Sequence, residues 1–396
     1  MDEMIGCDWS TGATYEVIGI MITMGKDDIR VVEARPFIHQ VGGRAVMLEI
    51  TPETICKLYK EKEFQFYKHK PDYLKEFTPH YKGLVSIKCS QDGDIPMFHA
   101  EVPGCILQNT DYPNNIEKRE EVKSGLDNWS LSRIHKEVKY KGLCSSSDKH
   151  DYTMLGNLVG SLRMPCILDL KIGTQQTGDD TTEEERRVRE DRSANSTSGT
   201  MGIRLSGMHM YEAETNTYLS HNKHHGWTLD DAGLRQELRR FFHNSCVLNV
   251  RDITRIINKL RRLHRILSIQ DKFYFFGSSL LLFYDGYLNN DHCSDHSKEG
   301  TTPSEKFDQS EKGLNVDQPT SSDEKDKRKN EGEGLNSVHL PECEYDTSTA
   351  DVRLIDFGRT VLKSDMKEHS YGTQFEEGIL FGLVNLIDIL QSIADN

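Results

Sequence analysis

One short segment, PCILDLKIG at residues 165–173, constrains the fold and chemistry of this chain more than any other. It is an apolar run of strand length that contains two charged residues, Asp169 and Lys171. Side chains of a strand alternate between its two faces, so these two residues share one face. The segment therefore predicts a buried sheet that presents an acid and an amine to a pocket.

An acid and an amine held in this way suit phosphoryl transfer to a hydroxyl group. The carboxylate can accept or orient the hydroxyl proton, and the lysine can neutralise phosphate charge. For an isolated D-x-K, a partly buried structural ion pair is the usual meaning. The longer pattern P-x-x-x-D-x-K-x-G, which includes Pro165 and Gly173, is far more specific.

Composition limits the class of protein. The 396 residues carry a net charge of −14, which argues against a general nucleic-acid or anionic-membrane binder, although a local basic pocket can still bind a small anion. The nine cysteines are scattered without a C-x-x-C pair, so we expect reduced thiols and a cytoplasmic or nuclear location. The apolar run Val17–Met24 is too short to span a bilayer and reads as part of a strand. We expect a monomer with no nucleic-acid or membrane partner.

The pattern of apolar runs divides the chain into two lobes. Residues 1–155 alternate short apolar runs with turn signals and predict a strand-rich lobe, whereas residues 156–396 predict a catalytic lobe of strands and helices. The expected strands lie at 16–24, 29–33, 45–50, 83–89, 201–211 and 217–219, and the expected helices at 231–243, 252–269 and 378–394. Residues 287–349 hold 15 acidic and 7 basic residues with almost no apolar periodicity, which predicts a disordered insertion.

Several motifs in chain order resemble those of the inositol polyphosphate kinase family, and within it the inositol hexakisphosphate kinases. Beyond the central segment they are HQVGG at 39–43, FTPHYKG at 77–83, NWSL at 128–131, GDD at 178–180, SSLL at 278–281, YDG at 284–286 and IDF at 355–357. The resemblance covers most of residues 36–287 and 351–396. It implies a two-lobed, kinase-like α+β fold with ATP between the lobes. It also implies ATP-dependent phosphorylation of inositol hexakisphosphate at an existing phosphate, which gives a diphosphoinositol phosphate.

The resemblance also implies roles for individual residues on the nucleotide side. Lys57 would bind the α- and β-phosphates of ATP, and Glu63 would pair with Lys57. The backbone at Gly42 and Gly43 would approach a phosphate, and Leu155 and Asn157 would lie at the hinge beside adenosine. From the residues alone, Gly42-Gly43 also suits a plain hairpin turn, and Glu63 also suits an exposed helix position.

The remaining roles concern the metal and the acceptor. Asp356 closes an apolar strand, and Mg²⁺ prefers oxygen ligands, so the resemblance makes Asp356 the metal ligand. Ser279 either lies near the metal or pairs within the sheet. Asp169 and Lys171 would be catalytic. The cations expected to bind the substrate phosphates are Lys171, Arg204 and Lys223.

Departures from the family pattern leave two alternative functions open. Gly156 stands where the hinge has glutamate, while Gln175 and Trp227 replace arginines. One alternative is therefore a non-catalytic inositol phosphate-binding protein. The other is a trisphosphate-type or multikinase-type enzyme that phosphorylates a hydroxyl of a less phosphorylated inositol, although the segments at 39–43 and 77–83 argue against it.

A histidine cluster, His221, His224 and His225, suggests zinc. Closed zinc sites need four well-spaced ligands, and no cysteine spacing lies nearby. The sequence therefore argues against a zinc site here.

Overall fold

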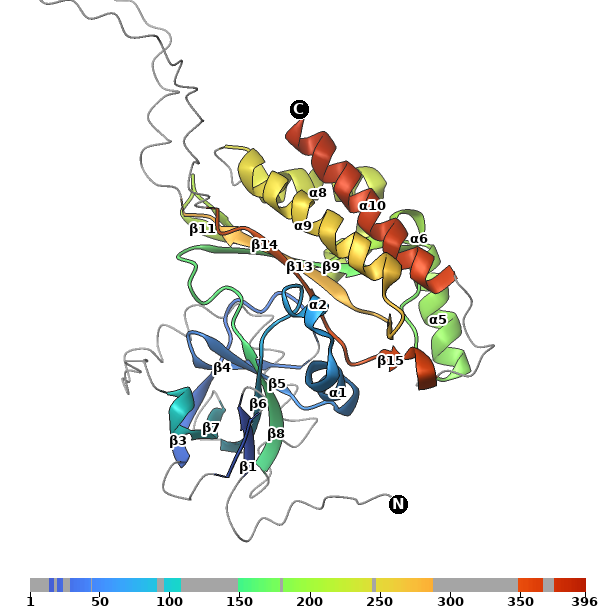
Figure 1. Cartoon of the computed structure of the whole chain (residues 1–396). Coiled ribbons are helices and arrows are strands. Elements are labelled where there is room, and N and C mark those ends of the chain that lie inside the picture. The colour runs from blue at the N-terminus through green and yellow to red at the C-terminus, as the bar shows by residue number, and fades with distance from the viewer. Residues whose placement is uncertain are drawn as a thin grey trace, which may run out of the picture. The chain divides into compact units, whose positions relative to one another are not determined.

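The computed structural model describes residues 14–17, 20–23, 29–43, 45–90, 96–107, 149–178, 181–243, 247–287, 348–365 and 374–396 (Figure 1). The predicted motif at 128–131, Asp179 and Asp180, and residues 288–347 of the predicted insertion lie outside these ranges. The insertion and the boundary between the two predicted lobes therefore stay predictions.

Six antiparallel strands form a closed barrel in the first part of the chain, in the order β3-β4-β5-β8-β6-β7. They are β3 (Ile29–Pro36), β4 (Met47–Thr51), β5 (Thr54–Leu58), β6 (Tyr81–Ser90), β7 (Met97–Pro103) and β8 (Lys149–Gly156). Alternate residues such as Leu48, Ile50 and Ala100 are fully buried in a core of their own. The barrel buries one face of each strand and closes without a free edge.

Shorter elements accompany the barrel. Between β5 and β6 run α1 (Glu61–His69) and α2 (Asp72–Lys75), and a 3-10 turn, Gly104–Ile106, follows β7. The single strand predicted at 16–24 is wrong, because the segment forms two paired strands, β1 (Thr14–Val17) and β2 (Ile20–Thr23). The strands β7 and β8 were not predicted.

A five-stranded antiparallel sheet follows, in the order β11-β10-β9-β13-β14. Its strands are β9 (Pro165–Ile172), β10 (Ile203–Glu212), β11 (Thr217–Asn222), β13 (Ser279–Asp285) and β14 (Asp351–Ile355). A small two-stranded sheet pairs β12 (Phe273–Phe275) with β15 (Thr360–Leu362), which leads into a 3-10 turn, Lys363–Asp365. Together with the barrel and the helices, these sheets confirm the predicted α+β class.

Helices cover one face of the five-stranded sheet (Figure 1). Among them are α8 (Asp231–His243), α9 (Val250–Ile269) and α10 (Gln374–Ala394), and the same region also contains α5 (Glu183–Ala194), α6 (Thr197–Met201) and the short α7 (Lys223–Thr228) beside β11. Thr182 caps the N-terminus of α5, since its hydroxyl accepts from the Glu185 amide. Residues Glu377–Ala394 are long and apolar enough to cross a membrane. However, Leu383, Leu386 and Leu390 of this helix are fully buried in the core, which accounts for the apolar sequence.

The alternation of β9 positions the chemistry. Leu168 and Leu170 are buried in the core, whereas Asp169 and Lys171 point to the opposite face, as their spacing predicted.

The described cysteines correct one expectation. Cys56 and Cys166 are free and buried, but Cys89 is disulfide-bonded. The expectation of reduced thiols throughout is therefore wrong for Cys89.

Candidate active site

Strand register brings the polar residues of the sheet into one row. Lys171 in β9 lies opposite Arg204 of β10 on one side and opposite Ser279 of β13 on the other. Ser279 in turn lies opposite Ile355, the last residue of β14. Because facing residues of neighbouring strands project to the same side, the row ends beside Asp356.

Asp356 adopts an unusual backbone conformation as it leaves β14. Its φ of 67° lies in the left-handed region, which costs a residue with a Cβ about 1–2 kcal/mol. The next residue, Phe357, is fully buried and stacks on Phe66 of α1, with 3.8 Å between the ring centroids. The turn thus anchors Phe357 in the core while Asp356 faces the opposite way.

Asp356 binds two lysines that come from different sheets. Its Oδ1 lies 2.7 Å from Lys57 Nζ of β5, and its Oδ2 lies 3.1 Å from Lys171 Nζ. Burial alone would raise the pKa of Asp356, but the two lysines outweigh burial and hold the pKa well below its usual range. Asp356 is therefore ionised at neutral pH.

Lys57 also contacts a buried carboxylate. Its Nζ lies 2.7 Å from Oε1 of Glu63, which is 2% exposed on α1. Burial opposes the charge of Lys57, yet Asp356 and Glu63 outweigh it and raise the pKa of the ammonium. The alternative of an exposed Glu63 is excluded by its burial.

Asp169 is buried in the site beside Lys171 and Arg204. Its side chain is 2% exposed, and its Oδ1 has no hydrogen-bond partner among the described residues. Burial raises the pKa of Asp169, although the nearby Lys171 opposes this effect. Ser279 is fully buried, and its hydroxyl likewise lacks a partner within the described part of the chain.

The loop before β4 packs directly against Asp169. The Gln40 amide holds this loop, since its Nε2 donates to the carbonyl oxygens of Gly42 and Ala45, at 2.8 Å each. A Cβ on Gly42 would lie 2.1 Å from Asp169 Oδ2, and a Cβ on Gly207 would lie 2.0 Å from the Val41 oxygen. Both positions therefore require glycine because the loop and the sheet approach so closely.

These groups line one cavity of about 930 Å³. Ten of the residues predicted for the site line it: Gly42, Gly43, Lys57, Leu155, Asn157, Asp169, Lys171, Arg204, Lys223 and Asp356. Two further predicted residues lie beneath the lining: Glu63 contacts Lys57, and Ser279 lies opposite Lys171 in the sheet. Among the described lining residues, seven are lysine or arginine and two are aspartate. The cavity is thus basic although the whole chain is acidic.

Sequence reasoning missed an aromatic contact in this cavity. The guanidinium of Arg204 lies 3.6 Å from the ring centroid of Trp227 on α7, and that of Arg192 lies 5.5 Å from it. Arg204 is 6% exposed, and burial lowers its pKa to about 10. Trp227 stands where the family pattern has an arginine. Its ring does not replace that charge but stabilises the neighbouring Arg204 guanidinium by a cation–π contact.

The hinge after β8 is fixed by its asparagine. Asn157 donates from its side chain to the Pro52 oxygen at 2.8 Å and from its backbone to the Glu53 oxygen at 3.0 Å. Gly156 donates to the His80 oxygen at 2.7 Å. The side chain of Asn157 therefore holds the hinge to the turn between β4 and β5.

The sequence is similar to known kinases. Residues 152–391 match the protein family described as inositol polyphosphate kinase. Inositol hexakisphosphate kinase 2 of Rattus norvegicus is 29% identical over 425 residues, which cover 91% of this chain and 94% of that protein. Inositol hexakisphosphate kinase 1 of Homo sapiens is 29% identical over 432 residues, which cover 92% and 95%. Among solved structures, inositol phosphate multikinase Ipk2 from S. cerevisiae, in complex with ADP and Mn2+, has 17% identity and a TM-score of 0.47, and it covers 86% of this chain and 98% of that chain.

Proposed function

Because this chain belongs to the inositol polyphosphate kinase family, we propose that it is an ATP-dependent inositol hexakisphosphate kinase that makes a diphosphoinositol phosphate. The relatives that it matches over nine-tenths of its length carry that activity in their names. Membership of the family agrees with the predicted kinase-like fold.

The observation that carries the proposal is the position of Lys57. It bridges Glu63 on α1 and Asp356 after β14, at 2.7 Å from each. A kinase needs a cation on the nucleotide phosphates, a carboxylate that fixes this cation and an acid for the metal. Lys57, Glu63 and Asp356 supply these three groups around one cavity.

The oxygen atoms of the site fit a magnesium ion. Mg²⁺ prefers hard oxygen ligands, usually one or two carboxylates together with phosphates. Asp356 is ionised, and the buried Ser279 hydroxyl beside the same strand end lacks a hydrogen-bond partner among the described residues. We infer that Asp356 and Ser279 would hold Mg²⁺, which supplies neutralisation of phosphate charge when it is bound.

The charge of the cavity suits a polyanionic acceptor. Lys171, Arg204 and Lys223 come from three separate elements and line the same cavity. The acceptor atom is a phosphate oxygen that is already anionic, so a strong base has little to do. The buried Asp169, with its raised pKa and unpaired Oδ1, is suited to align the acceptor phosphate through a hydrogen bond.

A comparison of acceptor substrates tests the proposal. The purified chain is given labelled ATP, Mg²⁺ and inositol tris-, tetrakis-, pentakis- or hexakisphosphate, and kcat/KM is measured for each acceptor. We expect the hexakisphosphate to have the highest value. Preferred transfer to a free hydroxyl of a less phosphorylated inositol would contradict the proposal, and binding without turnover would identify a non-catalytic inositol phosphate-binding protein.

A further inference from the structure

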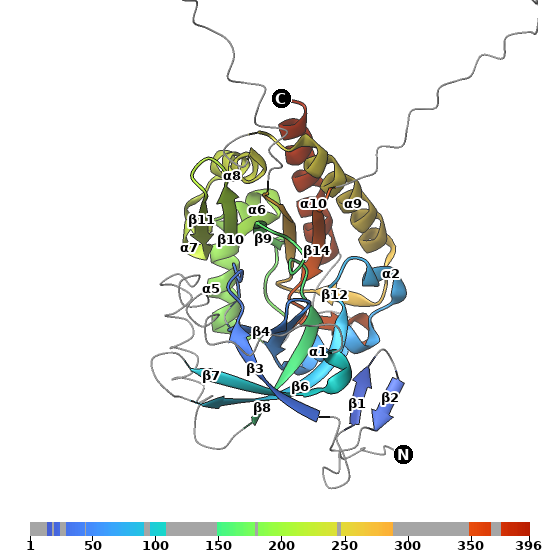
Figure 2. The same cartoon turned by 90° about the vertical axis from the view of Figure 1, so that its left-hand side faces the viewer.

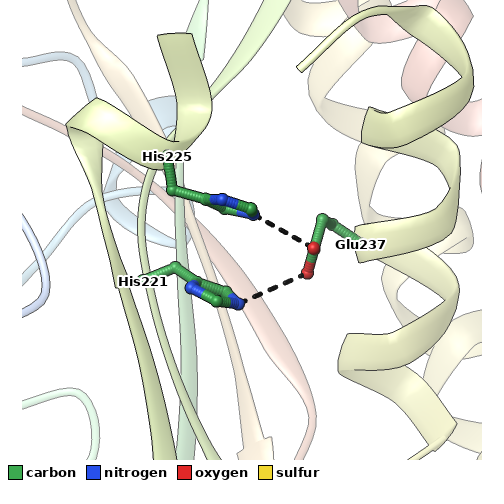
Figure 3. Close-up of side chains that lie close together, drawn as sticks. All are labelled: His221, His225 and Glu237. Atoms are coloured by element: carbon green, nitrogen blue, oxygen red, sulfur yellow. Dashed lines mark hydrogen bonds and ion pairs between the residues drawn. The ribbon is translucent and has the colours of Figure 1, made fainter. Parts of the chain in front are cut away.

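A second polar cluster lies at the edge of the five-stranded sheet, where β11 and α7 adjoin α8 (Figure 2). His221 is in β11, His225 is in α7 and Glu237 is in α8 (Figure 3). One ligand atom from each of the three lies within 4.8 Å of the other two. The observed cluster therefore contains His221 and His225 of the expected histidine cluster, and Glu237 lies beside them, whereas His224 does not belong to it.

Only one of the two histidines forms a hydrogen bond to Glu237. His225 Nε2 lies 3.0 Å from Glu237 Oε1, a normal hydrogen bond. His221 Nε2 and Glu237 Oε2 lie 3.9 Å apart, and both are buried atoms without a hydrogen-bond partner among the described residues. A buried polar atom without a partner costs about 1–3 kcal/mol, so two that face each other need an explanation.

The geometry of the two rings points to a shared ligand. The rings of His221 and His225 stack, with 4.0 Å between centroids and 23° between planes, and both direct a nitrogen at the same carboxylate (Figure 3). Two ligands of a tetrahedral zinc ion, each about 2.0 Å from the metal, lie about 3.3 Å apart. The two nitrogen–oxygen separations of 3.0 and 3.9 Å lie on either side of this value.

We propose that His221, His225 and Glu237 bind a divalent transition-metal ion of the zinc type. Two imidazoles and one carboxylate suit zinc, whereas Mg²⁺ takes oxygen ligands. Among the described residues no further His, Cys, Asp or Glu joins the group, so water would complete the coordination. The three side chains are 21%, 30% and 13% exposed in the order named, which leaves a path for the ion and its water.

The metal would fix a short helix that also reaches the basic cavity. The six-residue helix α7 carries His225 on one side, while its Lys223, His224 and Trp227 line the cavity. Such a short helix has little stability of its own. A metal ion that joins His225 of α7 to β11 and α8 would therefore hold Lys223 and Trp227 in place. The importance of these two residues for substrate binding rests on the proposed function.

Metal binding is tested on the full chain without an activity assay. The protein is stripped with a chelator, dialysed against Zn²⁺, and its metal content and zinc affinity are measured together with those of two variants, His221→Ala and Glu237→Gln. We expect one equivalent of zinc in the wild type. The zinc affinity of each variant should be about 10- to 100-fold weaker. Cobalt in place of zinc should give the intense visible absorption of a four-coordinate site.

His224→Asn is the matched control, since this neighbouring histidine lies outside the cluster. It should keep wild-type zinc affinity. Circular dichroism shows whether each variant is folded, and Glu237→Gln keeps the shape of the side chain. A wild type without stoichiometric zinc would overturn the proposal, as would a Glu237→Gln protein with unchanged affinity or a His224→Asn protein with equal loss. None of these outcomes depends on whether the chain phosphorylates an inositol phosphate.

Discussion

Lys57 and Asp356 are 299 residues apart in sequence, yet Lys57 Nζ and Asp356 Oδ1 lie 2.7 Å apart. This ion pair joins β5 of the barrel to the end of β14 in the five-stranded sheet. Each partner also binds a second charge, since Lys57 contacts Glu63 and Asp356 contacts Lys171. Four charges of alternating sign thus set the geometry of the proposed phosphate site.

Asp356→Asn should abolish magnesium-dependent turnover while the protein stays folded. Asparagine tolerates the left-handed backbone at this position, but it removes the negative charge that would hold the metal. Turnover and thermal unfolding are measured together. Asp351→Asn is the control, because Asp351 pairs with Lys259 outside the cavity. An Asp356→Asn enzyme with near wild-type kcat would show that Asp356 does not hold the metal.

Trp227→Ala should raise the KM for the inositol phosphate by about 2- to 30-fold and leave the KM for ATP unchanged. The indole holds the Arg204 guanidinium at 3.6 Å, a contact worth about 0.5–2 kcal/mol. Trp227→Phe, which keeps a ring, should lose less. If both variants change the KM for ATP and not that for the acceptor, Arg204 serves the nucleotide instead.

Gly156→Glu should lower the KM for ATP without changing the preferred acceptor. Gly156 is hydrogen-bonded to His80 in the structure, but glycine has more backbone freedom to lose when this position becomes ordered than a residue with a Cβ, a difference of roughly 0.5–1 kcal/mol. A Cβ at this position would lie 3.4 Å from the His80 Cβ, which leaves room for a side chain. The KM for ATP is compared in the two proteins, and a higher value in the variant would mean that the pocket is adapted to glycine.

Stability should fall as the pH drops from about 6.5 to about 4, in part because of His39. Burial lowers its pKa from 6.5 to about 4, so in this interval the unfolded chain binds a proton that the folded chain does not. The full effect is about 3 kcal/mol and is absent above pH 6.5, where both states are neutral. His39→Phe should remove this part of the slope in denaturant melts across pH. Equal slopes in the variant and the wild type would contradict the assignment.

Replacement of residues 290–345 by a short Gly-Ser linker should change the melting temperature by less than about 2 °C and leave kcat unchanged. This segment has too little apolar content to offset the entropy of ordering it. The strands that flank it, β13 and β14, are already paired, and the Asp285 amide donates to the Thr349 hydroxyl at 3.0 Å. A drop of many degrees would show that the segment packs on the rest of the chain.

The spacing of apolar residues predicted those features of the fold that depend on residues close together in the sequence. The shared face of Asp169 and Lys171 follows from the period of a strand, and the bounds of α8 follow from its apolar stripe. The β1–β2 hairpin was missed because one apolar run covers both strands, although Gly19 was a turn signal. The strand β7 was missed although its apolar Phe98, Ala100 and Val102 alternate with the polar His99 and Glu101, and β8 was missed because its first residues, KHD, are polar.

Contacts between distant elements needed either a resemblance or the structure. Nothing local to Asp356 predicts that it binds Lys57, and only the family pattern suggested a common site. The stacking of Trp227 on Arg204 and the position of Glu237 beside two histidines depend on how α7 and α8 pack on the sheet. No period in the sequence encodes that packing.

The most direct test of the central proposal is to identify the product made from inositol hexakisphosphate. The purified chain is incubated with ATP, Mg²⁺ and this acceptor, and the product is examined by phosphorus NMR, with Asp356→Asn as the inactive control. We predict one new pair of coupled diphosphate resonances on the inositol and one ADP per product. ADP formed without an inositol diphosphate, or no ADP at all from the folded wild-type protein, would contradict the assignment as an inositol hexakisphosphate kinase.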